Sequence, residues 1–318
     1  MFTDLAEADL REYSGSQLDP ADFDEFWADT LDESRAFALE VTVEPVSSPV
    51  KTVEIFDVTF SGYRGQPVKA WLRVPAGAEA PLPALVQFVG YGGGRGHAVE
   101  NLLWASAGFA HFQMDTRGQG SSWSSGDTPD PDGSGPAYPG VMTRGIESRE
   151  TYYYRRVFVD AVRAVEAARS LPSVDPSRVS VLGFSQGGGI ALAVAGLVPD
   201  LHAAFPFVPF LCDFPRATTI TDDYPYQEIV RYLAVHRDKA STVFETLRYF
   251  DGVNFAKRAA SPALFSTALM DPTCPPSTVF AAYNSYAADK EITVWPYNAH
   301  EGGALQDELN ALEALLAR

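Results

Sequence analysis

The sequence predicts an α/β protein with a mainly parallel central sheet and helices on both faces. Two observations predict this class. Six short runs are apolar at nearly every position, as expected for strands that are covered on both sides. Helical patterns separate several of these runs, and alternating strands and helices are typical of a parallel sheet.

The chain opens with a helical stretch and a hairpin. The N-terminal helical stretch includes residues 21–31, ADFDEFWADTL. Residues 53–63 and 67–77 then alternate apolar and polar side chains with a period of two. Only three residues, 64–66, separate these two runs, which predicts an antiparallel hairpin.

The continuous apolar runs follow the hairpin. The clearest helix is residues 151–171, where apolar side chains recur at three- and four-residue spacing. Residues 303–318 form another amphipathic pattern at the end of the chain. A hairpin that enters first and a helix that closes last favour the α/β-hydrolase arrangement. The six predicted buried strands are residues 82–91, 109–116, 178–185, 202–210, 263–271 and 292–298.

Two segments interrupt the alternation of strands and helices. Residues 122–142 are rich in Gly, Pro, Ser and Asp, which predicts a long loop. Residues 206–251 are rich in aromatic residues and Pro, and we interpret them as a helical insertion. Long insertions of this kind often have a function, so this one is expected to form part of a substrate wall. The prediction is one domain, residues 1–318, with an N-terminal extension.

The net charge limits the possible partners of the chain, and the cysteine content bears on its cellular location. The formal net charge is −17, which argues against nucleic acid or an anionic membrane as a partner because both would repel the chain. No apolar run approaches the length of a membrane span, and the acidic N-terminus does not resemble a signal peptide. Cys212 and Cys274 have no metal-ligand spacing, and free thiols predict a cytoplasmic location.

One serine lies in a sequence context typical of a nucleophile. Ser185 is the centre of Gly183-Phe184-Ser185-Gln186-Gly187, directly after a predicted strand and before a helix. The G-x-S-x-G pattern in that context predicts a nucleophile elbow, in which small flanking residues let strand and helix approach. The same glycines do not form a phosphate loop, because no Lys-Ser or Lys-Thr pair closes it. The remaining alternative is a chance match in a glycine-rich loop.

A serine nucleophile needs a base, and the position of each of the five histidines along the chain favours one of them. In the α/β-hydrolase order the acid and then the base follow the nucleophile. His97 and His111 precede Ser185, and that order excludes both. His202 belongs to a predicted buried strand and His236 to the insertion. The predicted base is His300, which follows the last strand.

The acid that orients this base is expected at the end of the preceding strand. Asp271 directly follows an apolar run, and Pro272 stops the strand there. Its predicted role is to hold the imidazole of His300 in one tautomer and to stabilise the imidazolium. An aspartate before a proline is also an ordinary turn residue, which is the alternative interpretation.

Acyl transfer also requires hydrogen-bond donors for the oxyanion. The backbone N–H groups of Gln186, next to the nucleophile, and of Tyr91, in the loop after an early strand, are the predicted donors. The aromatic content of the insertion suggests the wall of a substrate pocket. This wall is expected to include Tyr91, Phe210 and Pro225 of the Tyr224-Pro225-Tyr226 stretch.

Three motifs together resemble those of carbohydrate esterase family 7, the acetyl xylan esterases and cephalosporin C deacetylases. They are Arg117-Gly118-Gln119, the serine motif and His300-Glu301, in the order of that family. The similarity also covers REY, DFDEFW, GYGGGRG, VMTRGI and PFLCDF, which is nearly the whole chain.

The resemblance implies a deacetylase that acts on small acetylated sugars and on cephalosporins. Its triad corresponds to Ser185, Asp271 and His300, and its oxyanion hole to the N–H groups of Tyr91 and Gln186. No metal or organic cofactor is implied. Members of the family are hexamers whose active sites face an internal cavity, so the resemblance implies a homo-oligomer that prefers short substrates.

Two motif residues are interpreted as structural. Arg117 is expected to bond to backbone carbonyls or to a carboxylate, because a buried guanidinium needs fixed acceptors. Glu301 is adjacent to the predicted base, so it is expected to orient that loop and not to serve as the triad acid. Two other functions remain open. One is an α/β-hydrolase for other short-chain esters or lactones, and the other is a non-catalytic binding protein, which the intact set of Ser185, Asp271 and His300 disfavours.

Overall fold

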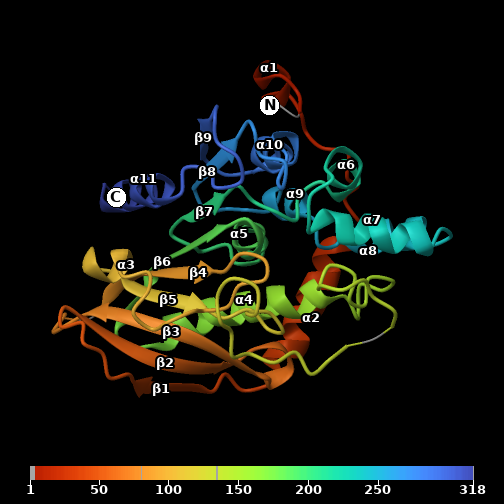
Figure 1. Ribbon diagram of the computed structural model, residues 1–318. Coiled ribbons are helices and arrows are strands. Elements are labelled where there is room, and N and C mark those ends of the chain that lie inside the picture. The colour runs from red at the N-terminus through yellow and green to blue at the C-terminus, as the bar shows by residue number, and fades with distance from the viewer. Residues whose placement is uncertain (1–3, 80, 134, 318) are drawn as a thin grey trace.

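The computed structural model describes residues 4–79, 81–133 and 135–317, and a nine-stranded sheet runs through its centre (Figure 1). The spatial order of the strands is β1-β2-β3-β5-β4-β6-β7-β8-β9. Their bounds are β1 Val41–Pro45, β2 Val53–Ser61, β3 Pro67–Pro75, β4 Leu82–Phe88, β5 Ala110–Met114, β6 Val174–Phe184, β7 Ala204–Phe207, β8 Ala263–Ala268 and β9 Lys290–Trp295.

The sheet is antiparallel at its start and parallel over the rest. Strands β1, β2, β3 and β5 are joined by antiparallel pairs, and every pair from β5 through β4 to β9 is parallel. The predicted hairpin is β2 and β3, with a short 3₁₀ turn, Tyr63–Gly65, between them. The α/β-hydrolase fold is therefore confirmed. Strand β1 was not predicted, although Val41 to Glu44 alternate apolar and polar residues; four of its five residues are exposed.

Helices cover both faces of the sheet, and the strands divide their side chains between them. Val86 and Phe88 of β4 belong to the large core that α4 and α5 cover. Leu85 of β4 and Leu182 of β6 belong to a second core with residues of α3 and α11. The helices are α1 Glu7–Leu10, α2 Phe23–Arg35, α3 Leu103–Ser106, α4 Tyr153–Ser170, α5 Gln186–Leu197, α6 Phe214–Ile220, α7 Tyr226–Val235, α8 Ala240–Leu247, α9 Gly252–Ala256, α10 Pro276–Ser285 and α11 Leu305–Leu316.

Most predicted boundaries agree within a few residues, with one shift that affects the insertion. Strand β7 ends at Phe207, not at residue 210, because Val208 has a positive φ of 37° and turns the chain. Pro206 and Phe207 pair with β6, so the helical insertion begins after them and contains α6, α7 and α8. Residues 122–142 have neither helix nor strand where the structure describes them. Arg318, the last residue of the predicted final helix, lies outside the described residues.

The N-terminal segment, residues 4–22, bonds to parts of the chain that follow much later. The carboxylate of Asp4 accepts hydrogen bonds from Arg216 in α6 and from the backbone N–H of Ser277 in α10, each at 2.7 Å. The hydroxyl of Tyr13 donates to Asp213, also at 2.7 Å. Figure 1 shows this segment beside α6 and α10. It therefore links the insertion, which contains α6, to α10, the helix that follows β8.

No described helix combines the length and the apolar character that crossing a membrane would require.

Candidate active site

Ser185 occupies a strained turn between β6 and α5. Its φ and ψ are 56° and −120°, a left-handed conformation that L-residues rarely adopt. Gly183 and Gly187 flank this turn, and at both positions a larger residue would collide with nearby backbone atoms. A Cβ on Gly183 would lie 2.1 Å from the carbonyl carbon of Gly187, and a Cβ on Gly187 would lie 2.2 Å from the carbonyl oxygen of Phe88. The turn therefore projects the serine beyond the carboxyl end of the sheet, in the geometry of a nucleophile elbow.

His300 and Asp271 lie in a line behind this serine. Nε2 of His300 is 2.9 Å from Oγ of Ser185, and Nδ1 is 2.9 Å from Oδ2 of Asp271. Asp271 follows β8 and is fully buried, while His300 lies in the loop between β9 and α11. The carboxylate can only accept, so Nδ1 carries the proton and Nε2 presents a lone pair to the serine hydroxyl. This arrangement can take the serine proton during nucleophilic attack.

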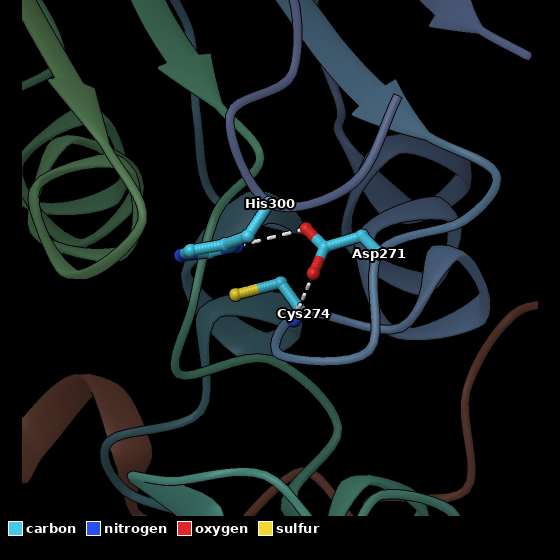
Figure 2. Close-up of side chains that lie close together, drawn as sticks. All are labelled: Asp271, Cys274 and His300. Atoms are coloured by element: carbon cyan, nitrogen blue, oxygen red, sulfur yellow. Dashed lines mark hydrogen bonds and ion pairs between the residues drawn. The ribbon is translucent and has the colours of Figure 1, made fainter. Parts of the chain in front are cut away.

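The second oxygen of Asp271 is held by the backbone. Oδ1 accepts the N–H groups of Thr273 and Cys274, at 2.8 and 2.9 Å. Asp271, Cys274 and His300 are the one group of metal-ligand side chains found among the described residues, with ligand atoms within 4.8 Å of one another (Figure 2). The bonds from His300 and from the two backbone N–H groups account for both carboxylate oxygens. Burial raises the pKa of the Cys274 thiol well above its usual value, so a neutral thiol adjoins Asp271 and His300.

Gln119 links the loop that contains Tyr91 to Gln186, the first residue of α5. Gln119 accepts a hydrogen bond from the N–H of Gly92 at 2.7 Å and donates to Oε1 of Gln186 at 2.8 Å. The side chain of Gln186 in turn donates to the carbonyl of Val89 at 3.1 Å. Among the described residues, neither predicted donor N–H makes a backbone hydrogen bond of its own. Both remain available to an oxyanion.

The side chain of Tyr91 is held by a buried acid. Its hydroxyl donates to Oε1 of Glu228 at 2.5 Å and accepts the N–H of Val141 at 2.8 Å. Oε2 of Glu228 accepts the N–H of Met142 at 3.0 Å. Burial raises the pKa of Glu228, and burial next to this acid raises that of Tyr91. Tyr91, whose backbone N–H is one predicted oxyanion donor, therefore has its side chain held by Glu228 of the insertion.

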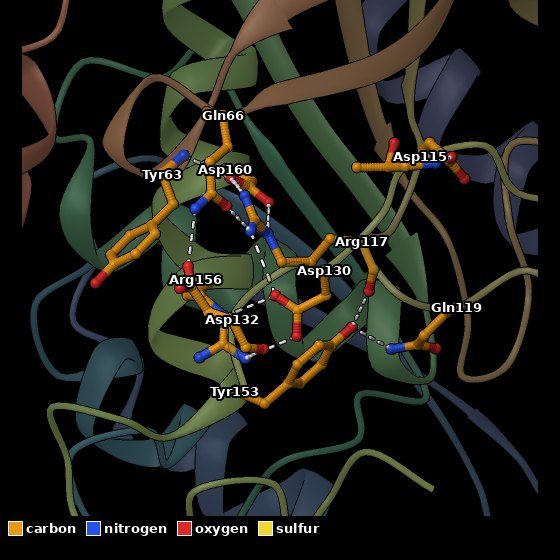
Figure 3. Close-up of polar contacts among 12 residues, drawn as sticks. Tyr63, Gln66, Asp115, Arg117, Gln119, Asp130, Asp132, Tyr153, Arg156 and Asp160 are labelled. Atoms are coloured by element: carbon orange, nitrogen blue, oxygen red, sulfur yellow. Dashed lines mark hydrogen bonds and ion pairs between the residues drawn. The ribbon is translucent and has the colours of Figure 1, made fainter. Parts of the chain in front are cut away.

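Arg117 belongs to a buried ion-pair network with Asp160 and Asp130 (Figure 3). Only 1% of its side chain is exposed, and Nε and Nη2 bond to the two carboxylate oxygens of Asp160 at 2.5 and 2.8 Å. Nη1 bonds to Gln66 at 2.5 Å, and the carbonyl oxygen accepts the hydroxyl of Tyr153 at 2.5 Å. Burial opposes its charge, but Asp160 raises the pKa of Arg117 above its usual value. Arg117 does not line the serine cavity, and its bonds are structural.

The other motif residues hold loops. Gly118 has a φ of 67°, and a Cβ there would lie 2.9 Å from Cβ of Asp130. Glu301 accepts the side-chain amide of Asn298 at 3.0 Å, a bond within the loop that carries His300.

Ser185 opens into a cavity of about 660 Å³, a size typical of small-molecule sites. Tyr91 and Pro225 line it, as does His300, and the insertion contributes Tyr224 as well. The predicted contribution of Phe210 is wrong. That ring is fully buried and packs on Tyr226, with centroids 4.3 Å apart, so it supports the wall from behind.

Sequence reasoning missed Trp123, which also lines this cavity and is 64% exposed. A lone tryptophan in a loop of Gly, Ser and Asp was the available signal, but no periodicity marks the direction of such a side chain. Phe184 and Leu305 are further lining residues that were not predicted.

Comparisons with known proteins agree with this geometry. A family model described as acetyl xylan esterase (AXE1) matches residues 1–313. An acetyl xylan esterase structure from Paenibacillus sp. R4 is 39% identical, with a TM-score of 0.92 over 98% of this chain and 99% of that one. Acetyl xylan esterase 1 from Thermoanaerobacterium sp. JW/SL YS485 is 36% identical, with a TM-score of 0.91 over 98% and 99% of the two chains.

A curated relative is longer than this chain. Acetyl esterase Axe7A of Xylanibacter ruminicola (strain ATCC 19189 / DSM 19721 / CIP 105475 / JCM 8958 / 23) is 28% identical over 298 residues. The match covers 88% of this chain and 63% of that relative. The family model and both structures nevertheless span almost all of the present chain. The chain belongs to the acetyl xylan esterase family, a family of carboxylic ester hydrolases.

Proposed function

We propose that this protein is a serine esterase that removes acetyl groups from small acetylated sugars such as xylo-oligosaccharides. The observation that carries the proposal is the line from Asp271 through His300 to Ser185, with both contacts at 2.9 Å, at the edge of a 660 Å³ cavity. The acetyl specificity is supported by the family and by the names of its acetyl xylan esterase relatives.

The mechanism proceeds in two halves. Oγ of Ser185 attacks the acetyl carbonyl while His300 takes the hydroxyl proton on Nε2, and the oxyanion accepts the N–H groups of Tyr91 and Gln186. The intermediate collapses, the bond to the sugar oxygen breaks, and His300 returns the proton to that oxygen. Water, deprotonated by His300, then attacks the acetyl-enzyme. The bond from the acetyl carbon to Oγ of Ser185 breaks, His300 returns the proton to Oγ, and acetate leaves.

Several finer features belong to the same proposal. Cephalosporin C is proposed as a second substrate because the sequence resembles deacetylases that act on it. A hexamer is proposed on the same ground. A cytoplasmic location is proposed because both cysteines are free and buried. The insertion, with Tyr224 and Pro225 in the cavity lining, is proposed as part of the substrate wall of a single domain.

The test is hydrolysis of 4-nitrophenyl esters from acetate to octanoate by the wild type and by Ser185→Ala. Activity restricted to short acyl chains and lost in the variant supports the proposal. A best rate on longer chains removes the acetyl specificity but keeps the serine hydrolase. Absence of Ser185-dependent turnover of any ester overturns the proposal and favours a binding protein on the same fold.

A further inference from the structure

A second cavity adjoins the one that contains Ser185. Its volume is about 610 Å³, and Gly90, Trp123 and Phe184 line both cavities. A ligand that extends past these three residues would therefore occupy both spaces. The catalytic triad makes no contact with the second cavity, so the proposed chemistry does not explain it.

Trp123 forms a flat platform at the boundary. Its ring lies over a run of glycines, where a Cβ on Gly93 would be 2.2 Å from the ring and a Cβ on Gly90 would be 3.5 Å from it. Its Nε1 donates to the carbonyl of Tyr91 at 2.8 Å, which fixes the ring orientation. One face of the indole is thus covered by backbone, while 64% of the residue stays exposed. The C–H face of a pyranose ring can stack on such a surface.

A buried arginine orients two amides in the wall of the second cavity. Arg73 is fully buried, and its Nη1 donates to Oε1 of Gln113 at 2.8 Å and faces Nδ1 of His111 at 3.4 Å. Since Arg73 only donates, His111 accepts at Nδ1 and carries its proton on Nε2, which lies 2.7 Å from Oε1 of Gln87. Burial and Arg73 lower the pKa of His111, which keeps it neutral.

The side-chain oxygens of Gln87 and Gln113 therefore both accept hydrogen bonds from protein groups, His111 and Arg73 respectively. The NH₂ groups of Gln87 and Gln113, both of which line the cavity, are left as donors to a ligand. The lining also supplies hydroxyl groups at Ser124 and Ser125 and a carboxylate at the exposed Glu100. That carboxylate disfavours an anionic ligand. Fixed donors, acceptors and an aromatic platform together suit the hydroxyl-rich surface of a neutral sugar.

We propose that the second cavity is a carbohydrate subsite that binds the sugar unit next to the acetylated one. This inference rests on the proposed function for the identity of the ligand. The subsite gives the esterase a preference for oligosaccharides over acetylated monosaccharides, and Trp123 is the residue that both sugar units contact.

The first test is calorimetric titration of xylotriose, which carries no acetyl group, so that binding does not depend on catalysis. The wild type should bind xylotriose at least about tenfold more tightly than xylose. Ser125→Trp, which fills the second cavity, and Trp123→Ala, which removes the platform, should each weaken xylotriose binding by about tenfold or more. Ser121→Trp is the matched control, because it places the same side chain in the same loop outside both cavities.

The possible results separate the two proposals. Binding of xylotriose by a protein that hydrolyses no acetate ester would leave the subsite intact and overturn the proposed function. Hydrolysis of 4-nitrophenyl acetate without saturable binding of xylotriose would overturn the subsite alone. Unchanged xylotriose affinity in folded Ser125→Trp and Trp123→Ala would also overturn it, as would an equal loss in Ser121→Trp.

Discussion

Replacing Gln119 with alanine tests whether this side chain positions the oxyanion hole. Gln119 makes three hydrogen bonds of 3.0 Å or less, to the N–H of Gly92, to Gln186 and to the hydroxyl of Tyr153. At about 1 kcal/mol for each bond, the variant should lose about 3 kcal/mol of unfolding free energy. For a chain of this size that corresponds to a fall in Tm of roughly 4 to 5 °C.

The larger signal is expected in catalysis. Loss of a complete oxyanion donor costs about 10² to 10³ in kcat, and here the donors remain but their loops are released. We therefore expect kcat for 4-nitrophenyl acetate to fall about 10- to 100-fold, which is a rise of about 1.4 to 2.7 kcal/mol in the activation free energy. KM should change little, because the cavity lining is intact.

Gln66→Ala provides the matched control. Gln66 bonds to Arg117 and to Asp132, so the same side chain is removed from the same network, but away from both oxyanion loops. This variant should lose about 2 kcal/mol of unfolding free energy and keep wild-type kcat. Wild-type kcat in Gln119→Ala despite the lower Tm would refute the positioning role. An equal fall of kcat in Gln66→Ala would refute it as well, because both losses would then follow from general destabilisation.

Three further substitutions probe the elbow, the triad and a buried acid. Asp271→Asn should lower kcat by roughly 10⁴ with an unchanged circular dichroism spectrum, and retention of a tenth of the activity would contradict the acid assignment. In Gly187→Ala the new Cβ would lie 2.2 Å from the carbonyl oxygen of Phe88, so Tm should fall by several degrees, and an unchanged Tm would show that the turn can widen. Burial raises the pKa of Asp251 to about 7, so its contribution to stability is present at low pH and is lost as pH rises through 7. Between pH 5 and 8 the wild type should lose about 3 kcal/mol of unfolding free energy that Asp251→Asn does not lose, and equal pH dependence in urea titrations would exclude this titration.

The fold could be predicted because its signals are local. Continuous apolar runs identify buried parallel strands, and the period-two alternation before them identifies the hairpin. The order Ser185, Asp271, His300 along the chain follows from the same topology, since each residue comes directly after a parallel strand or in the loop that follows it. These inferences need no knowledge of side-chain packing.

The remaining features depend on where individual side chains point and on which distant residues meet, and neither can be read from the sequence pattern. Phe210 was assigned to the pocket from aromatic content alone, but the left-handed residues Val208 and Leu211 on either side of it turn the chain, and its ring packs in the core. Trp123 lies in a loop without periodicity. The bond between Gln119 and Gln186 joins residues 67 positions apart, so only the folded chain brings the two motifs together.

The contacts of the N-terminal segment also determine when this protein can finish folding. Asp4 is synthesised first, but its partner Arg216 follows 212 residues later and its partner Ser277 follows 273 residues later. Chain closure over such separations is slow, and on the ribosome it cannot occur until Ser277 has emerged. During synthesis the segment therefore lacks these partners until residues 216 and 277 have been made. Its docking therefore follows the synthesis of α6 and of the start of α10.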